Sequence, residues 1–140
     1  AIFSACGGGE QPATTTATTE EAPVSMVAPT ELTKEQKIEQ GKAVYEKVCQ
    51  ACHQADGKGV PGAFPPLAES DYLAADLTKS IHGVVHGLSG EITVNGVKFN
   101  SAMPKSDLSD EEIANVFTYV LNNFSNKGGE VSAADVAATR

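Results

Sequence analysis

The chain has 140 residues, with 10 Lys and Arg against 18 Asp and Glu, so its formal net charge is −8. An acidic chain without a basic cluster lacks the cations that nucleic-acid phosphates require, and we expect no nucleic-acid partner. The sequence has no apolar run long enough to span a bilayer. Aromatic residues make up 6% and Trp is absent, which is typical of a small domain that completes its core with a cofactor, a metal or disulfides.

Composition divides the chain into four segments. Residues 1–6 are small or apolar and end in a Cys that three glycines follow. Residues 7–30 are rich in Gly, Pro, Thr, Ala and Glu without apolar periodicity, which predicts a flexible tether. Residues 31–127 carry the periodic patterns of a folded domain. Residues 128–140 form a C-terminal tail, in which one short helical turn is expected after Ser132.

Cys6 has to be considered separately, because the sequence has three cysteines and at most two can pair with each other. Small residues before a Cys and a Gly-rich tether after it look like a bacterial lipoprotein cleavage site, in which the Cys carries acyl chains. We therefore predict that residues 1–6 are a signal-peptide remnant and that lipid on Cys6 holds the protein on a membrane. The alternative is a free thiol.

The first predicted helix runs from about Lys34 to Cys49. Thr33 and Gln36 have the spacing of an N-terminal capping box. A Gly inside a helix costs about 1 kcal/mol relative to Ala, so Gly41 indicates that another segment approaches closely there. The expected apolar stripe consists of Ile38, Gly41, Tyr45 and Val48.

Residues 56–70 are rich in Gly and Pro and predict irregular structure. A middle helix is expected over residues 76–86, and residues 91–100 alternate around Asn95-Gly96, which predicts a β-hairpin with a type I′ turn.

The last major helix begins after Ser109, which has the spacing of a second capping box with Glu112, and is expected to end at residues 127–129. Its apolar positions follow helical spacing: Ile113, Val116, Phe117, Val120, Leu121 and Phe124.

The string Cys49-Gln50-Ala51-Cys52-His53 carries the chemistry. Two thiols on one helical turn can each form a thioether with a vinyl group of one porphyrin, and the adjacent imidazole then lies beneath the iron. A redox dithiol would need a βαβ context and a zinc site would need two further ligands, whereas this motif closes a helix in a helical domain. The motif therefore predicts one covalent haem c, attached through Cys49 and Cys52, with His53 as an axial ligand.

Met103 is the predicted second axial ligand of the iron. It lies in an irregular loop between the hairpin and the last helix, where Pro104 restricts the backbone. A thioether ligand raises the reduction potential relative to a second imidazole. Met26 lies in the predicted tether and is a poor candidate. His82 and His86 are spaced by one helical turn, and a bis-imidazole haem that uses one of them is the alternative to Met103.

The CxxCH motif, the SAMPK sequence around Met103 and the VFTYVLN helix together resemble the class I cytochrome c family over residues 34–127. The hairpin and the FPPLAESDYL segment are similar to small bacterial monohaem cytochromes and to the haem c domain that is fused to copper nitrite reductases. The resemblance implies an all-α fold in which helices surround one covalently bound haem, with a small β-hairpin inserted before the axial Met.

The resemblance also implies roles for particular residues. Gly41 would lie where the first helix crosses the last. The backbone carbonyl of Pro65 would accept a hydrogen bond from the second ring nitrogen of His53, which fixes the ring and makes the ligand more basic. Leu67 would pack on the haem.

These features predict an electron carrier rather than an enzyme, because filled axial positions leave no place for a substrate on the iron. The expected function is transfer of single electrons between respiratory or photosynthetic redox partners, at a haem edge near Val60, Ala63, Phe64 and Ala102. The lipid anchor implies the bacterial periplasm or the outer face of the cell membrane. The alternatives are a haem c domain or subunit of a larger oxidoreductase, such as a nitrite reductase or a respiratory complex, and a ligand sensor in which Met103 is displaced.

Overall fold

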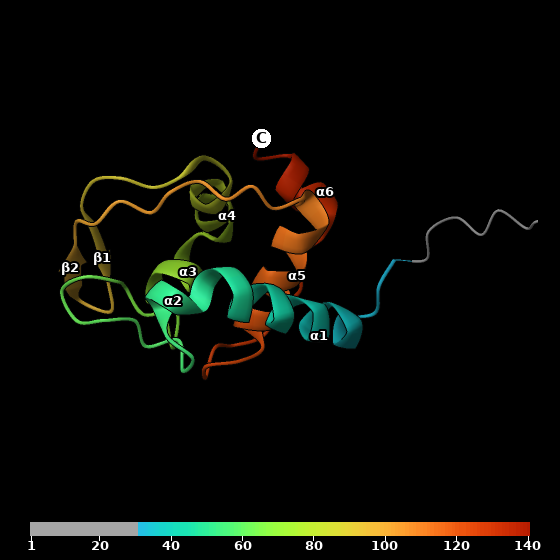
Figure 1. Ribbon diagram of the computed structural model, residues 1–140, viewed down its shortest axis with the longest axis horizontal. Helices are drawn as coiled ribbons and strands as arrows, with labels where there is room; N and C mark the ends of the chain where they lie inside the picture. Colours follow the sequence, from blue (N-terminus) through green and yellow to red (C-terminus); the bar gives the residue numbers. More distant parts are fainter. Residues whose placement is uncertain (1–30) are drawn as a thin grey trace, which may run out of the picture. The chain divides into compact units, whose positions relative to one another are not determined.

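Two long helices cross at the centre of the protein in the computed structural model, which describes residues 31–140 (Figure 1). Helix α1 spans Lys34–Val44 and helix α5 spans Asp110–Leu121. Gly41 is buried at the crossing, where a Cβ atom on it would lie 2.0 Å from the backbone oxygen of Asn115. Only a residue without a side chain fits there, so the close approach predicted at Gly41 is confirmed.

Both crossing helices begin with the capping boxes that the sequence predicts. The hydroxyl of Thr33 accepts a hydrogen bond from the N–H of Gln36 at 3.3 Å, and the Gln36 side chain accepts one from the N–H of Thr33 at 2.9 Å. Ser109 and Glu112 make the same pair of bonds, at 3.2 and 2.9 Å. These bonds satisfy backbone donors that have no partner within the first turn of a helix.

The first helix continues beyond α1 through a π-helical turn, η1 at Tyr45–Cys49, into α2 at Gln50–His53. A π turn holds about one residue more than an α turn, so it rotates the residues that follow it around the helix axis. The prediction that Val48 belongs to the buried stripe is therefore wrong. Val48 is 44% exposed, and Cys49 packs against the core instead.

Two short helices follow the irregular segment that was expected over residues 56–70. Helix α3 spans Asp71–Ala75, and α4 spans Leu77–His86 in agreement with the predicted middle helix. Sequence periodicity does not detect α3, because five residues are too few to define a helical face. Its start is set by Ser70, whose hydroxyl accepts a hydrogen bond from the N–H of Leu73 at 3.3 Å.

The predicted hairpin is present as strands β1 (Ile92–Val94) and β2 (Val97–Phe99), which pair antiparallel. Asn95 and Gly96 between them have φ values of 50° and 78°. Positive φ at both positions is what a type I′ turn requires. The hairpin lies at one end of the protein in Figure 1, beside the long connection that leads to α5. The expectation of a helical fold with one small hairpin is thus confirmed.

Helix α5 ends at Leu121, so the predicted end at residues 127–129 is wrong. The side-chain amides of Asn122 and Asn123 each donate to the carbonyl four residues earlier in the chain, at 2.7 and 2.8 Å. Side chains that satisfy the last helical carbonyls compete with continuation of the helix. Phe124, which was expected on the helical stripe, has a left-handed backbone with φ of 56° and packs against the ring of a buried tyrosine.

The C-terminal segment 128–140 packs on α5 and α4, and its one helix, α6, spans Ala133–Ala137. Val131 and Val136 are among the most buried residues of the described chain, at 1% and 0% exposure. The hydroxyl of Thr118 on α5 accepts a hydrogen bond from the N–H of Val131 at 3.1 Å. Residues 31–140 therefore form one unit with a shared core.

The predictions for residues 1–6 and 7–30, including lipid on Cys6 and the exclusion of Met26 as a ligand, fall outside the described residues. Within residues 31–140, no helix combines the length and the apolar character that crossing a membrane requires.

Candidate cofactor site

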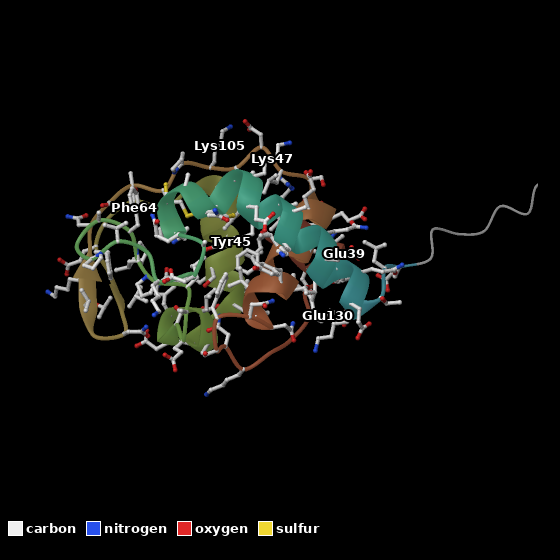
Figure 2. All side chains as sticks on the ribbon, turned by 60° about the horizontal axis from the view of Figure 1, so that its bottom comes forward. Glu39, Tyr45, Lys47, Phe64, Lys105 and Glu130 are labelled. Atoms are coloured by element: carbon white, nitrogen blue, oxygen red, sulfur yellow. The ribbon has the colours of Figure 1, made fainter. Side chains whose placement is uncertain are left out.

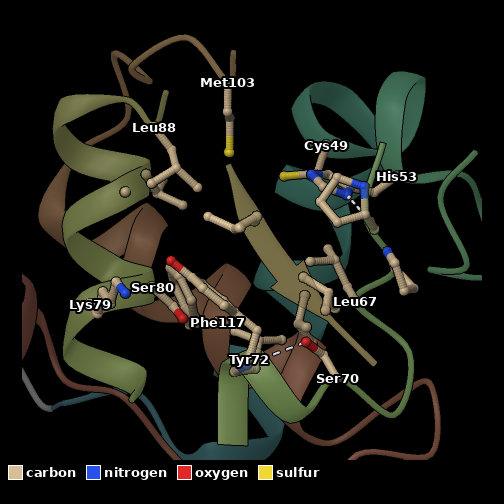
Figure 3. A pocket seen from close by; sticks show the side chains of 18 of the residues that line it. Cys49, His53, Leu67, Ser70, Tyr72, Lys79, Ser80, Leu88, Met103 and Phe117 are labelled. Carbon is tan, nitrogen blue, oxygen red and sulfur yellow. Dashed lines mark hydrogen bonds between the residues drawn. The ribbon is translucent and has the colours of Figure 1, made fainter. Parts of the chain in front are cut away.

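A pocket bounded by α3, α4, α5 and β1 holds about 750 Å³ of space free of protein atoms, part of it open to solvent. Most of the side chains that point into it are apolar (Figure 3). Five of the six predicted cofactor-binding residues line the pocket: Cys49, His53, Pro65, Leu67 and Met103. Cys52 is half-buried and does not line it.

The π turn and α2 place the thiol and imidazole of the CxxCH motif on one helical face. Cys49 and His53 are four residues apart, so their side chains lie one turn from each other. Neither of the two described cysteines, Cys49 and Cys52, forms a disulfide. Burial, with a smaller effect from the neighbouring Cys52, raises the pKa of the Cys49 thiol to about 11. Before a thioether forms, this thiol is therefore uncharged at neutral pH, as an apolar pocket wall requires.

His53 is only 8% exposed and its ring is fixed by one backbone group. Its Nδ1 lies 2.9 Å from the carbonyl oxygen of Pro65. A carbonyl can only accept, so Nδ1 carries the hydrogen and Nε2 keeps a lone pair for a metal. Burial lowers the pKa of His53, and the hydrogen bond to Pro65 opposes that shift, so the imidazole is neutral at pH 7.

The Pro65 carbonyl reaches His53 because the backbone at Gly59 packs closely against the backbone of Phe64 and Pro65. The N–H of Gly59 donates to the carbonyl of His53 at 2.9 Å, and its φ is 65°. A Cβ atom on Gly59 would lie 2.2 Å from the carbonyl oxygen of Phe64. The position therefore needs glycine for both its backbone angle and its space.

Asn126 ties the same loop to the end of α5, a role that the sequence analysis missed. Its side-chain amide donates to the carbonyls of Leu67 and Val120, at 2.8 and 2.9 Å, and its side-chain oxygen accepts from the N–H of Ser70 at 3.2 Å. All three partners are backbone groups, so no residue pairing in the sequence signals the contact. Asn122 and Asn123 lie nearby and have the same side chain, so the sequence does not show which asparagine holds the loop.

Met103 is held by hydrogen bonds of its own backbone, whereas His53 is held by a hydrogen bond of its side chain. Its N–H donates to the carbonyl of Leu88 at 2.8 Å, and its carbonyl accepts from the N–H of Leu88 at 2.9 Å. Three residues later, the N–H of Ser106 donates to the carbonyl of Val84 on α4 at 3.0 Å. In Figure 3 the sulfur of Met103 points into the pocket.

His82 and His86 do not line the pocket. Both are exposed on α4, with ring centroids 4.3 Å apart. His86 Nε2 lies 2.7 Å from the carbonyl oxygen of Thr139, so it contacts the C-terminal segment. Of these three candidates for the second ligand, only Met103 therefore lines the pocket.

The donor set fits a haem c. Two adjacent thiols, a neutral imidazole with a free Nε2 and a thioether sulfur are the groups that attach and ligate such a cofactor, and the apolar walls suit a porphyrin. One polar atom gives a second indication. The hydroxyl of Tyr72, which also lines the pocket, is buried without a hydrogen-bond partner among residues 31–140. A buried hydroxyl without a partner is costly, so the pocket suits a ligand that has a polar group near Tyr72.

Comparison with known proteins agrees with the geometry. The family model described as cytochrome c matches residues 38–124. Cytochrome c-552 of Thermus thermophilus is 41% identical over 87 residues, which are 57% of this chain and 64% of that protein. The cytochrome c subunit of a quinone-type alcohol dehydrogenase of Gluconobacter oxydans is 36% identical over 104 residues, 71% of this chain and 22% of that subunit. The fructose dehydrogenase cytochrome subunit of Gluconobacter japonicus is 32% identical over 109 residues, 74% and 22% of the two chains. The chain thus spans less than two thirds of the length of each of these relatives.

Proposed function

Because the chain belongs to the cytochrome c family, carries covalent haem c and functions in electron transfer, we propose that it shuttles single electrons between redox partners with His53 and Met103 as axial ligands. The bound haem supplies a reversible one-electron change at its iron. The pocket is the observation that carries the proposal, because an imidazole and a thioether from two separate segments enter the same apolar space.

The residues around the two proposed ligands support a carrier rather than an enzyme. The Pro65 carbonyl restrains the ring of His53, and the paired backbone bonds with Leu88 restrain Met103. If both residues bind the iron of a haem, they would leave no position there for a substrate. The apolar wall excludes water and favours the less charged, reduced state.

An absorption spectrum at controlled potential, taken on protein of measured intact mass, tests this function. We expect c-type bands, a mass of the polypeptide plus one haem besides any acyl groups, and pigment that stays with the denatured chain in organic solvent. The Met103→Ala variant should bind carbon monoxide, whereas Met26→Ala, His82→Ala and His86→Ala should not. Ready binding of carbon monoxide by the unaltered protein at neutral pH would contradict two strong axial ligands.

The second candidate function is that of a haem-carrying subunit in a larger oxidoreductase. The similarity to cytochrome subunits of alcohol and fructose dehydrogenases favours it. Purification of the native protein from membranes without tags distinguishes the two functions. A carrier should elute alone, whereas a subunit should elute with catalytic activity in a complex of larger mass.

We further propose that lipid on Cys6 and the tether 7–30 hold the haem domain at the outer face of a bacterial cell membrane, in the periplasm. Small residues before Cys6 and glycines after it support this location. In cells, Cys6→Ser should move the protein from the membrane to the soluble fraction, while the control Thr16→Ser should leave it on the membrane. Membrane retention of Cys6→Ser would contradict the anchor.

The surface near Val60, Ala63, Phe64 and Ala102 is the proposed site of electron exit. Val48, next to Cys49, adds one of the two large apolar side chains that are exposed in the described chain. In Figure 2, Lys47 and Lys105 project from the same edge of the protein, whereas Glu39 and Glu130 lie nearer the start of α1. A small apolar contact beside a few charges suits a transient redox complex. Its association rate should fall as salt is added.

A further inference from the structure

Two exposed histidines on α4 have no part in the cofactor site. His82 and His86 are four residues apart, so they lie one turn from each other on the same face of the helix, and neither lines the pocket. Their ring centroids are 4.3 Å apart and the ring planes are inclined by 38°. Two imidazoles at this helical spacing can bind a single metal ion together.

The distance between the two rings suits one ion bound by both. An imidazole nitrogen binds zinc at about 2.0 to 2.1 Å, so two nitrogens on one ion lie within about 4 Å of each other. Because both side chains are exposed, rotation about their χ angles can bring one nitrogen of each ring to the ion without displacing other side chains of the core. The same exposure lets water fill the remaining coordination positions.

A backbone carbonyl orients one of the two rings. Nε2 of His86 lies 2.7 Å from the carbonyl oxygen of Thr139 in the C-terminal segment. A carbonyl can only accept, so in the neutral ring Nε2 carries the hydrogen and Nδ1 keeps the lone pair. Histidines that bind metals almost always donate their other ring N–H to a carbonyl, a carboxylate or water, which fixes the tautomer. His86 therefore has the arrangement of a ligand that binds through Nδ1.

The charges near the pair permit a cation. Arg140, on the C-terminal segment, is paired with the carboxylate of Asp110. Lys79 lies three residues before His82, and its ammonium lies over the ring of Tyr72, 5.4 Å from the ring centroid. The chain as a whole has a net charge of −8, which raises the local concentration of cations at its surface.

We propose that His82 and His86 bind one exchangeable divalent transition-metal ion, through Nδ1 of His86 and one ring nitrogen of His82. Imidazole ligands suit Zn²⁺, Cu²⁺ and Ni²⁺, whereas Mg²⁺ and Ca²⁺ bind oxygen ligands. Because His86 also contacts Thr139, the bound ion stabilises the contact between α4 and the C-terminal segment. This site is independent of the proposed function, since neither histidine lines the haem pocket.

Titration calorimetry of the holoprotein with ZnCl₂, after treatment with a chelator and its removal, tests the site. Zinc is chosen because it has no redox chemistry and leaves the oxidation state of the haem unchanged. The variants are His82→Ala and His86→Ala, and Thr78→Ala is the matched control at an exposed position one turn earlier on α4. MgCl₂ is the control ion.

We expect the unaltered protein and Thr78→Ala to bind one zinc ion with the same affinity and to bind magnesium much more weakly. Each histidine variant should bind zinc about tenfold more weakly or worse, because it keeps only one of the two ligands. Absence of zinc binding by the unaltered protein would overturn the proposal. Equal affinity in the histidine variants would also overturn it, and would assign the bound zinc to other surface groups.

Long-range ¹H–¹⁵N NMR spectra of the reduced holoprotein test which nitrogen binds. Zinc should shift the Nδ1 resonance of His86, while Nε2 keeps its hydrogen and its bond to Thr139. Zinc on Nε2 of His86 would overturn the orienting role of Thr139. The absorption bands of the haem should stay unchanged when zinc is added, so loss of this site leaves the proposed function intact.

Discussion

Replacement of Asn126 by Ala tests how the protein holds the loop that carries Pro65 and Leu67. The change removes two donated bonds, to the carbonyls of Leu67 and Val120, and one accepted from the N–H of Ser70. Each such bond contributes about 0.5 to 1.5 kcal/mol net, so the loss of all three should lower the free energy of unfolding by about 2 to 4 kcal/mol. At about 4 °C per kcal/mol for a domain of this size, Tm should fall by about 8 to 16 °C.

The same change should reach the proposed axial ligand. The loop that Asn126 holds carries Pro65, whose carbonyl accepts the hydrogen bond from His53. A looser loop weakens that bond and makes the imidazole a weaker electron donor. The oxidised haem then loses more stabilisation than the reduced haem, so the reduction potential should rise.

Denaturant unfolding of the holoprotein, followed by absorbance, measures the stability, and a redox titration measures the potential. Asn123→Ala is the matched control, because it removes one bond to the α5 backbone at 2.8 Å and does not contact the loop. It should cost about 1 kcal/mol and leave the potential unchanged. An Asn126→Ala protein that is as stable as the Asn123→Ala control, with an unchanged potential, would refute the reasoning.

Three further changes are checked by denaturant unfolding. Gly41→Ala puts a Cβ atom 2.0 Å from a backbone oxygen of α5 and should lower the free energy of unfolding by about 3 kcal/mol or more. The control Ala43→Gly, at an exposed site on the same helix, should lower it by about 1 kcal/mol. Equal losses would contradict the close crossing. Val136→Ala removes two methyl groups from a fully buried site and should cost about 2 kcal/mol; a cost near zero would show that the C-terminal segment is not part of the core. Hydrogen bonds from Ser132 lower the pKa of Asp135 below its ordinary value, and the bond from the Ser132 backbone has the largest effect. The ionised carboxylate therefore stabilises the fold above about pH 4, and this stabilisation is lost as pH falls through the lowered pKa. The stability gap between the unaltered protein and Asp135→Asn should therefore shrink between about pH 5 and pH 3, and a constant gap would contradict the assignment.

Local sequence rules predicted the parts of the fold whose causes are local. The capping boxes at Thr33 and Ser109 and the type I′ turn at Asn95-Gly96 depend on residues three positions apart or fewer. The contact at Gly41 was also predictable, because a glycine weakens a helix and is favoured within an apolar stripe where a neighbouring segment packs closely. The CxxCH motif and Met103 lie far apart in the chain, so no local rule places them together. Their position on one pocket was predicted from the motif together with the family resemblance.

The features that the sequence did not predict depend on side-chain and backbone geometry that residue types alone do not specify. The π turn at Tyr45–Cys49 changes which residue faces the core, yet its composition is that of an ordinary helix. The early end of α5 depends on the side chains of Asn122 and Asn123, which turn back onto the helix rather than into solvent. The role of Asn126 depends on backbone carbonyls, which are the same at every residue and so leave no trace in a sequence.

The described part of the chain has two kinds of core. The crossing of α1 and α5 and the packing of α6 are complete within the polypeptide, because their buried side chains meet one another. The segments around the pocket are different: α3, α4, β1, the Met103 loop and one side of α5 face a pocket, partly open to solvent, that the polypeptide does not fill. The low aromatic content has the same cause, because a porphyrin supplies the flat apolar surface that Trp and Phe supply in other small domains. Haem c therefore completes the core on this side of the protein as well as serving as its redox centre.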